Sequence, residues 1–144
     1  MKKKLLIEII ASLLIILFLY TGITKLIEHA TFRYQLSISP WSLLASWSGI
    51  VSWVLPIGEV LLAAMLLITA CRKTAFIASA ILFAGFLVYL GMLLGSGTKL
   101  PCTCGGIISS MSWNAHVWFD AACLLLCMTG IWLVHNTYRI LNQH

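Results

Sequence analysis

The chain has 144 residues, of which 61% are hydrophobic and only 9% are charged. A water-soluble domain has about 25% charged residues, so this composition excludes an ordinary soluble domain and indicates a single integral membrane domain. The net charge of +5 does not indicate nucleic-acid binding, because the nine Lys and Arg residues are spread along four apolar stretches and form no basic face.

The first apolar stretch covers about residues 5–27 and follows the basic start Met1–Lys4. This start resembles a secretory signal, but no small-x-small cleavage site follows, and the apolar run continues through Thr21-Gly22-Ile23. Its length predicts an uncleaved transmembrane helix. Glu8, near the inner face, is expected to be a solvated end charge.

Residues 28–48 mix charged, aromatic and serine residues around Pro40. This composition predicts an outer surface loop with one or two short amphipathic turns. Its apolar side chains, among them Phe32 and Leu36, are expected at the membrane interface, where aromatic residues favour the headgroup level.

The second and third spans are predicted over about 49–70 and 75–95, joined by a tight turn at Cys71-Arg72-Lys73-Thr74. The third span contains Ala80-x3-Ala84 and Gly91-x3-Gly95. Such spacings of small residues let membrane helices approach closely.

A polar outer segment, 96–111, precedes a fourth span predicted over about 112–135, with Ser110 or Ser112 as its N-cap. The fold class is therefore an all-α, polytopic bundle of four transmembrane helices.

The basic residues predict the orientation in the membrane. With the N-terminus inside, the inner ends hold six of them, namely Lys2, Lys3, Lys4, Arg72, Lys73 and Arg139. The outer loops hold three, namely Lys25, Arg33 and Lys99. The positive-inside rule then places both termini in the cytoplasm and 96–111 outside, in the periplasm for a protein of a Gram-negative inner membrane.

The outer segment carries Pro101-Cys102-Thr103-Cys104-Gly105-Gly106. A disulfide across one intervening residue closes a strained ring, and strain marks labile, catalytic disulfides rather than structural ones. The start of the fourth helix and Lys99 would favour the reactive thiolate. Disulfides also persist on this side of the membrane. Two other interpretations stay open, namely a passive pair of thiols and a soft metal site with further ligands.

The fourth span places His116, Asp120, Cys123 and Cys127 on one helical stripe through their +4, +3, +4 spacing. Cys123 and Cys127 are interpreted as small core residues, because buried cysteine packs as an apolar side chain. Ionisable groups in a membrane mark functional or paired sites. His116, near the outer surface, could exchange protons with a thiolate; its alternative role is an interfacial hydrogen bond.

Glu59 lies in the second span at about 15 Å below the outer surface. A carboxylate at that depth needs a cation or a proton. Lys25 is the candidate partner, because its long side chain can reach along the first helix. The pair either fastens the two helices together or forms a polar wall for a quinone or for proton uptake.

These residues together resemble the MauE/DoxX family of redox-associated membrane proteins, and the form of the cysteine motif is similar to that of Bacteroidetes-type members. The matching segments cover nearly the whole chain: Tyr20-Thr-Gly-Ile-Thr-Lys25-Leu, Phe32 with Leu36, Leu55-Pro-Ile-Gly-Glu59, Pro101-Cys-Thr-Cys-Gly-Gly106 and Trp113-x-x-His116-x-x-Phe119. Asp120 stands where Asn is expected, and Cys71, Cys123 and Cys127 match nothing in the pattern.

The resemblance implies a DoxX-like four-helix bundle, loosely like the vitamin K epoxide reductase (VKOR) and DsbB proteins. MauE itself is tied to maturation of a disulfide-rich periplasmic enzyme and works beside a thioredoxin-like partner. DsbB-type oxidases have a second outer cysteine pair, whereas this chain has none in its outer loops.

We therefore expect a membrane thiol–disulfide oxidoreductase, with a quinone as a plausible acceptor by analogy. Cys102 and Cys104 would exchange electrons with a periplasmic thioredoxin-like protein or a cysteine-containing client, and His116 would move protons. Lys25, Glu59 and Asp120 would shape an intramembrane polar pocket. The alternatives are a non-catalytic membrane scaffold and a metal-handling or small-solute membrane protein.

Overall fold

The computed structural model describes residues 2–97 and 112–141, and every regular element within them is a helix. The elements are α1 (Lys2–Ile27), α2 (His29–Ser37), α3 (Ser42–Ser46), α4 (Ser48–Leu67), α5 (Arg72–Gly95) and α6 (Trp113–Leu141). Four helical stretches are long and apolar enough to cross a membrane: Lys2–Ile27, Ser48–Leu67, Arg72–Gly95 and Asn114–Thr137. The predicted all-α bundle of four transmembrane helices is confirmed.

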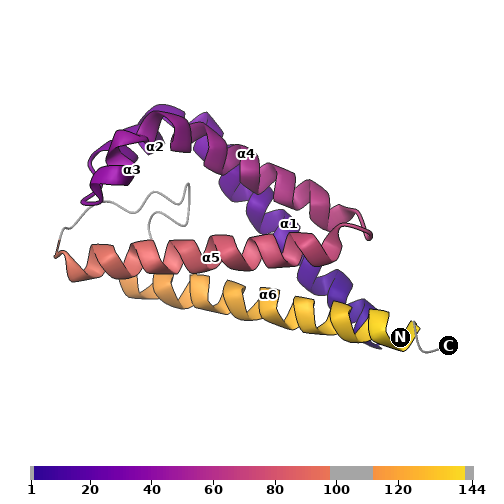
Figure 1. Ribbon diagram of the computed structural model, residues 1–144. Coiled ribbons are helices and arrows are strands. Elements are labelled where there is room, and N and C mark those ends of the chain that lie inside the picture. Colours follow the sequence, from indigo (N-terminus) through magenta and orange to yellow (C-terminus); the bar gives the residue numbers. More distant parts are fainter. Residues whose placement is uncertain (1, 98–111, 142–144) are drawn as a thin grey trace.

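The four long helices pair as α1 with α4 and α5 with α6, and contacts between α1 and α6 and between α4 and α5 join the two pairs. Helix α1 begins and α6 ends at the same end of the molecule, which we call the inner end (Figure 1). At the opposite, outer end, α5 finishes, α6 starts and α2 and α3 lie across the bundle (Figure 1).

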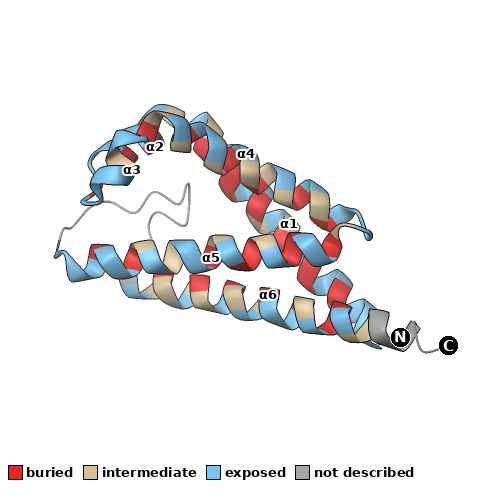
Figure 2. Cartoon of the chain, viewed as in Figure 1, coloured by how far each residue is buried: buried red, intermediate tan, exposed pale blue. Residues whose placement is uncertain are grey.

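Each long helix buries one stripe of residues spaced three or four apart, the spacing that brings side chains to one helical face. The buried stripe of α1 consists of Ile7, Ile10, Ala11, Leu14, Phe18, Thr21, Gly22 and Lys25. The opposite faces stay exposed and strongly apolar, with Leu13, Ile16, Ile81 and Trp132 among the side chains there. Figure 2 shows this division along the helices. Such outward faces suit contact with lipid.

Between α1 and α4, the chain forms two helices where the sequence predicts a loop with short turns. Helix α2 has nine residues and buries Phe32 and Leu36 against the bundle. Helix α3 has five residues and buries none. Because Phe32 and Leu36 are buried, α2 packs on the outer end of the bundle and does more than connect α1 to α4.

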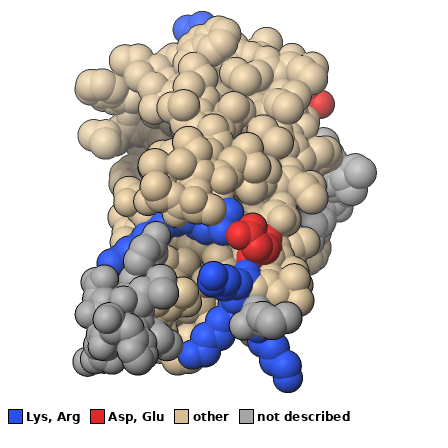
Figure 3. All heavy atoms as spheres, turned by 90° about the vertical axis from the view of Figure 1, so that its right-hand side faces the viewer, with Lys and Arg blue, Asp and Glu red and all other residues tan. Residues whose placement is uncertain are grey.

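The inner end is held by Arg72, and Glu8, which is 56% exposed as expected of a solvated end charge, also pairs with it. The Arg72 guanidinium donates from Nη1 to Glu8 Oε1 at 2.6 Å and from Nε to the carbonyl oxygen of Leu66 at 3.1 Å. Arg72 thus links α1 to the end of α4. Figure 3 shows Lys and Arg side chains gathered on this face beside acidic groups.

Close helix approach occurs at glycines other than the predicted pair. A Cβ on Gly130 of α6 would lie 2.8 Å from an atom of the Phe76 ring on α5, and one on Gly22 would lie 3.1 Å from the carbonyl oxygen of Pro56. Around Gly91 and Gly95, by contrast, no atom of the described residues lies within 4 Å of such a Cβ. Among the described residues, this pair therefore makes no close helix contact, and both glycines are exposed.

We expect Gly130→Ala to lower the free energy of unfolding by about 1–3 kcal/mol, because the added methyl group overpacks the contact with Phe76. Gly85→Ala is the matched control, since a Cβ there meets no described atom within 4 Å. Alanine in a helix is favoured over glycine by about 0.5–1 kcal/mol, so the control should be neutral or slightly stabilised. Thermal unfolding in detergent micelles measures both, and equal effects would contradict this account of the α5–α6 contact.

Candidate functional site

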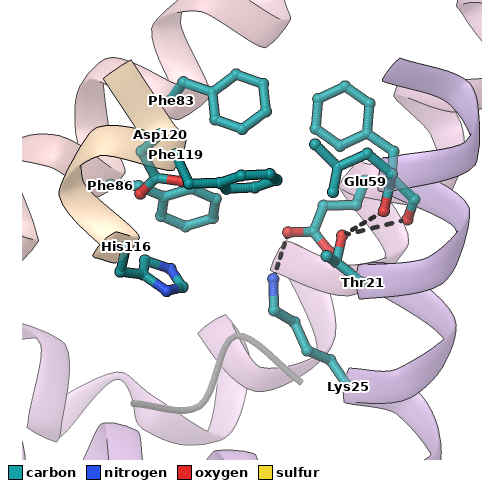
Figure 4. A pocket seen from close by; sticks show the side chains of 10 residues that line it. Thr21, Lys25, Glu59, Phe83, Phe86, His116, Phe119 and Asp120 are labelled. Atoms are coloured by element: carbon teal, nitrogen blue, oxygen red, sulfur yellow. Dashed lines mark hydrogen bonds and ion pairs between the residues drawn. The ribbon is translucent and has the colours of Figure 1, made fainter. Parts of the chain in front are cut away.

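The described part of the chain contains a small polar pocket between α1, α4, α5 and α6. Its volume is about 20 Å³, and it is lined by Leu17, Phe18, Thr21, Lys25, Glu59, Phe83, Phe86, His116, Phe119 and Asp120. In Figure 4, Lys25 and Glu59 face it from one side and His116 projects toward it from the other. The pocket brings together every predicted site residue that the structure describes.

Lys25 and Glu59 form a buried ion pair between α1 and α4. Lys25 Nζ donates to Glu59 Oε1, and the two side chains are only 4% and 1% exposed. The close approach of the helices at Gly22 brings the two residues together. The ammonium also lies 5.2 Å from the centroid of the Phe86 ring, within the range of a cation–π contact. These contacts offset part of the cost of removing the charges from water.

The second oxygen of the Glu59 carboxylate, Oε2, is buried and accepts no hydrogen bond from any described residue. A buried polar atom without a partner is costly, and the cost is larger for a charged group. Because Glu59 lines the pocket, this oxygen is an open hydrogen-bond acceptor of the site.

His116 and Asp120 come from α6, one helical turn apart, and are 1% and 4% exposed. The helix is positioned by its N-cap, because the amide N–H of Ala115 donates to Ser112 Oγ at 3.4 Å and that of His116 donates to the Ser112 carbonyl at 3.0 Å. The capping expectation therefore holds for Ser112. Ser110 lies outside the described residues.

Cys123 and Cys127 continue the same stripe of α6 but do not line the pocket. Both are buried in the hydrophobic core, together with residues such as Leu14 and Phe76. They are therefore packing residues here, as the sequence suggests.

Cys102 and Cys104 lie outside the described residues, as do Pro101, Gly105 and Gly106. The chain connection alone relates them to the pocket: segment 98–111 follows the end of α5 and precedes the start of α6. His116 lies near the beginning of α6, so it is the pocket residue nearest to the cysteines along the sequence.

The sequence analysis did not identify Thr21, Phe83 or Phe86 as site residues. Thr21 lies one turn before Lys25 on the same face, which is a signal that the sequence does carry. The two phenylalanines of α5 resemble any other apolar residues of a membrane span. Only the packing of α5 against the other helices brings them to the charged pair.

A quinone ring does not fit the pocket, whose 20 Å³ correspond to about one water molecule. We therefore derive no step through a quinone at this site. A second cavity of about 210 Å³ lies at the outer end and is lined by Pro40, Trp41, Tyr89, Met92, Leu93 and Ser96. Among the residues that the structure describes, no Lys, Arg, Asp, Glu or His side chain lines that second cavity.

The chain matches a known protein family. The family of the methylamine utilisation protein MauE matches residues 3–133, which include two of the long apolar helical stretches in full and most of the first and the fourth. No curated protein and no solved structure matches the chain.

We expect Lys25→Met to lower the free energy of unfolding by about 3–5 kcal/mol, because it leaves the Glu59 carboxylate buried without its cation. The double variant Lys25→Met, Glu59→Met should recover most of that loss, since the uncompensated charge is gone. Glu8→Gln serves as the control, because Glu8 is 56% exposed and its pair with Arg72 should contribute about 1 kcal/mol or less. Unfolding titrations in mixed micelles measure all three. If the double variant is as unstable as the single one, the charge pairing is not the cause.

Proposed function

Because the chain belongs to the MauE family, we propose that it serves methylamine utilisation as a membrane thiol–disulfide oxidoreductase. Cys102 and Cys104 are the redox pair. The partner is a periplasmic thioredoxin-like protein or a cysteine-containing client, and the result is disulfide formation or maturation of an exported protein.

The proposed reaction is an exchange between two cysteine pairs. A thiolate of one pair attacks a sulfur of the other pair's disulfide, which forms a mixed disulfide and releases one thiolate. The second thiol of the attacking pair then displaces the partner, so that one pair is oxidised and the other becomes a dithiol. Two electrons and two protons pass between the pairs, and no further oxidant enters this step.

The observation that carries the proposal is the position of His116. It lies near the start of α6, directly after the segment that contains the cysteines, and its side chain lines a buried pocket with Lys25 and Glu59 (Figure 4). Histidine changes its charge near neutral pH, so it is suited to take the proton of an attacking thiol and to return it to a leaving thiolate. The start of α6 also favours the thiolate through its helix dipole.

The proposed orientation in the inner membrane has both termini in the cytoplasm and the cysteine segment in the periplasm. Lys2, Lys3, Lys4 and Lys73 are exposed at the inner end of the described structure, where Arg72 also lies. Such an excess of basic residues is typical of cytoplasmic ends. Helix α5 ends and α6 begins at the opposite end (Figure 1), and the cysteine segment lies between these two helices in the sequence.

We expect one of the variants Cys102→Ser and Cys104→Ser to accumulate a mixed disulfide with a periplasmic protein, because the neighbouring thiol that would displace the partner from the attacking cysteine is missing. Non-reducing gels followed by mass spectrometry of the captured protein measure this. The variant that retains the attacking cysteine identifies it, and Cys71→Ser is the matched control that should behave like the unmodified protein.

The competing function, a non-catalytic membrane scaffold, makes a different prediction for the same cells. There, neither serine variant captures a partner, and the Cys102–Cys104 pair keeps one redox state under both oxidant and reductant. A double serine variant that still supports full maturation of the client would also exclude the redox role.

Membrane topology can be checked with thiols that the chain already has. A membrane-impermeant maleimide added outside spheroplasts should label reduced Cys102 and Cys104, whereas Cys71, at the turn before α5, should react only after the membrane is opened. Buried Cys123 and Cys127 should react only after denaturation. Labelling of Cys71 from outside would reverse the proposed orientation.

A further inference from the structure

The polar pocket meets the physical requirements of a water site. A buried water needs a cavity of roughly 10–15 Å³ or more and two to four polar partners. The pocket has about 20 Å³. The carboxylate oxygen Glu59 Oε2 is at least nine-tenths buried, belongs to a lining residue and accepts no hydrogen bond from the described residues.

The groups around the pocket also have complementary hydrogen-bonding roles. Thr21 donates its hydroxyl proton to the carbonyl oxygen of Leu17 at 3.0 Å, so its oxygen remains an acceptor toward the pocket. Lys25 Nζ has three N–H donors and uses one for Glu59 Oε1. A water molecule can therefore accept from Lys25 and donate to Glu59 Oε2, which satisfies the open acceptor.

The charged and titratable groups that line the pocket are Lys25 from α1, Glu59 from α4, and His116 and Asp120 from α6. Helix α5 contributes the apolar rings of Phe83 and Phe86. With His116 protonated, the four groups carry two positive and two negative charges. If the proton moves from His116 to Glu59, the total is still zero, because one imidazolium and one carboxylate become neutral together. A site with low dielectric favours such a transfer over one that leaves a net charge.

We propose that this pocket binds one ordered water molecule that joins Glu59 Oε2 to His116 and passes a proton between them. The proton leaves the His116 ring for the water, and the water gives one of its protons to Glu59 Oε2, so that the water is restored. Glu59 then holds the proton inside the bundle and also remains the hydrogen-bond partner of Lys25. The use of this proton by the cysteine pair rests on the proposed function, whereas the water site does not.

The test uses the full chain in lipid bilayers with both Cys102 and Cys104 replaced by Ser, so that its outcome is independent of redox activity. Solid-state NMR measures magnetisation transfer from water to the side-chain carboxyl carbon of Glu59, whose signal is assigned as the one lost in Glu59→Gln. We expect rapid transfer to Glu59 despite its burial. Absence of this transfer in the folded protein would overturn the proposal.

Two threonines of α1 provide matched variants. Thr21 lines the pocket, whereas Thr24 does not, although its hydroxyl makes the same type of bond, to the carbonyl oxygen of Tyr20 at 2.7 Å. In Thr21→Ile the added carbon atoms occupy about the volume of one water, so transfer to Glu59 should fall by about fivefold or more. Thr24→Ile should leave it unchanged.

Hydrogen exchange follows the proton path itself. Exchange of the His116 ring proton with deuterated solvent should slow by about tenfold in Thr21→Ile and remain unchanged in Thr24→Ile. If Thr21→Ile fails to fold, Thr21→Val removes one polar partner without enlarging the side chain and should reduce the transfer to Glu59. Equal transfer and equal exchange rates in all folded variants would show that no pocket water links the two residues.

Discussion

The buried ion pair between Lys25 and Glu59 is the interaction around which the rest of the bundle is arranged. It joins α1 to α4 inside the bundle, where the two side chains are only 4% and 1% exposed. A lone charge there would be costly, so each residue fixes the position of the other. The glycine contact at Gly22 and the aromatic rings of Phe32 and Phe86 around the ammonium are the local conditions that let the pair form.

The hydrophobic effect cannot hold the four helices together inside a membrane, because lipid is as apolar as the side chains that the helices expose. Packing and polar contacts between helices take over that role. Gly130 lets α6 approach the Phe76 ring of α5, and Arg72 connects α1, the end of α4 and the start of α5 at the inner end. The outer end has the Lys25–Glu59 pair and the small helix α2 above it. The pairs α1–α4, α4–α5 and α5–α6 thus each have a specific contact.

The polar pocket concentrates two carboxylates, one ammonium and one imidazole in a cavity that admits about one water molecule. This size favours proton chemistry over binding of an organic cofactor. Histidine at the beginning of α6 faces the ion pair, and the cysteine segment enters α6 at the same end. The proposed thiol exchange needs a proton acceptor and donor near the sulfur atoms, and the pocket is the only cluster of buried ionisable groups in the described residues that lies on that side of the bundle.

Much of this protein follows from the order of its residues. Apolar length predicts the four membrane helices, the spacing of His116, Asp120, Cys123 and Cys127 predicts one buried face, and the depth of Glu59 requires a cation such as Lys25. These features depend on local periodicity and on the cost of a charge in lipid, both of which a sequence displays.

Tertiary structure alone decided which small residues lie at helix contacts, because Gly22, Gly91 and Gly130 have similar surroundings in the sequence and differ only in what faces them. The tertiary structure also pairs Glu8 with Arg72, 64 positions away in the sequence. It places Phe83 and Phe86 in the pocket that contains Lys25 and Glu59. Long-range partners of this kind depend on how helices are rotated and crossed, and that geometry is set by the packing of all four at once.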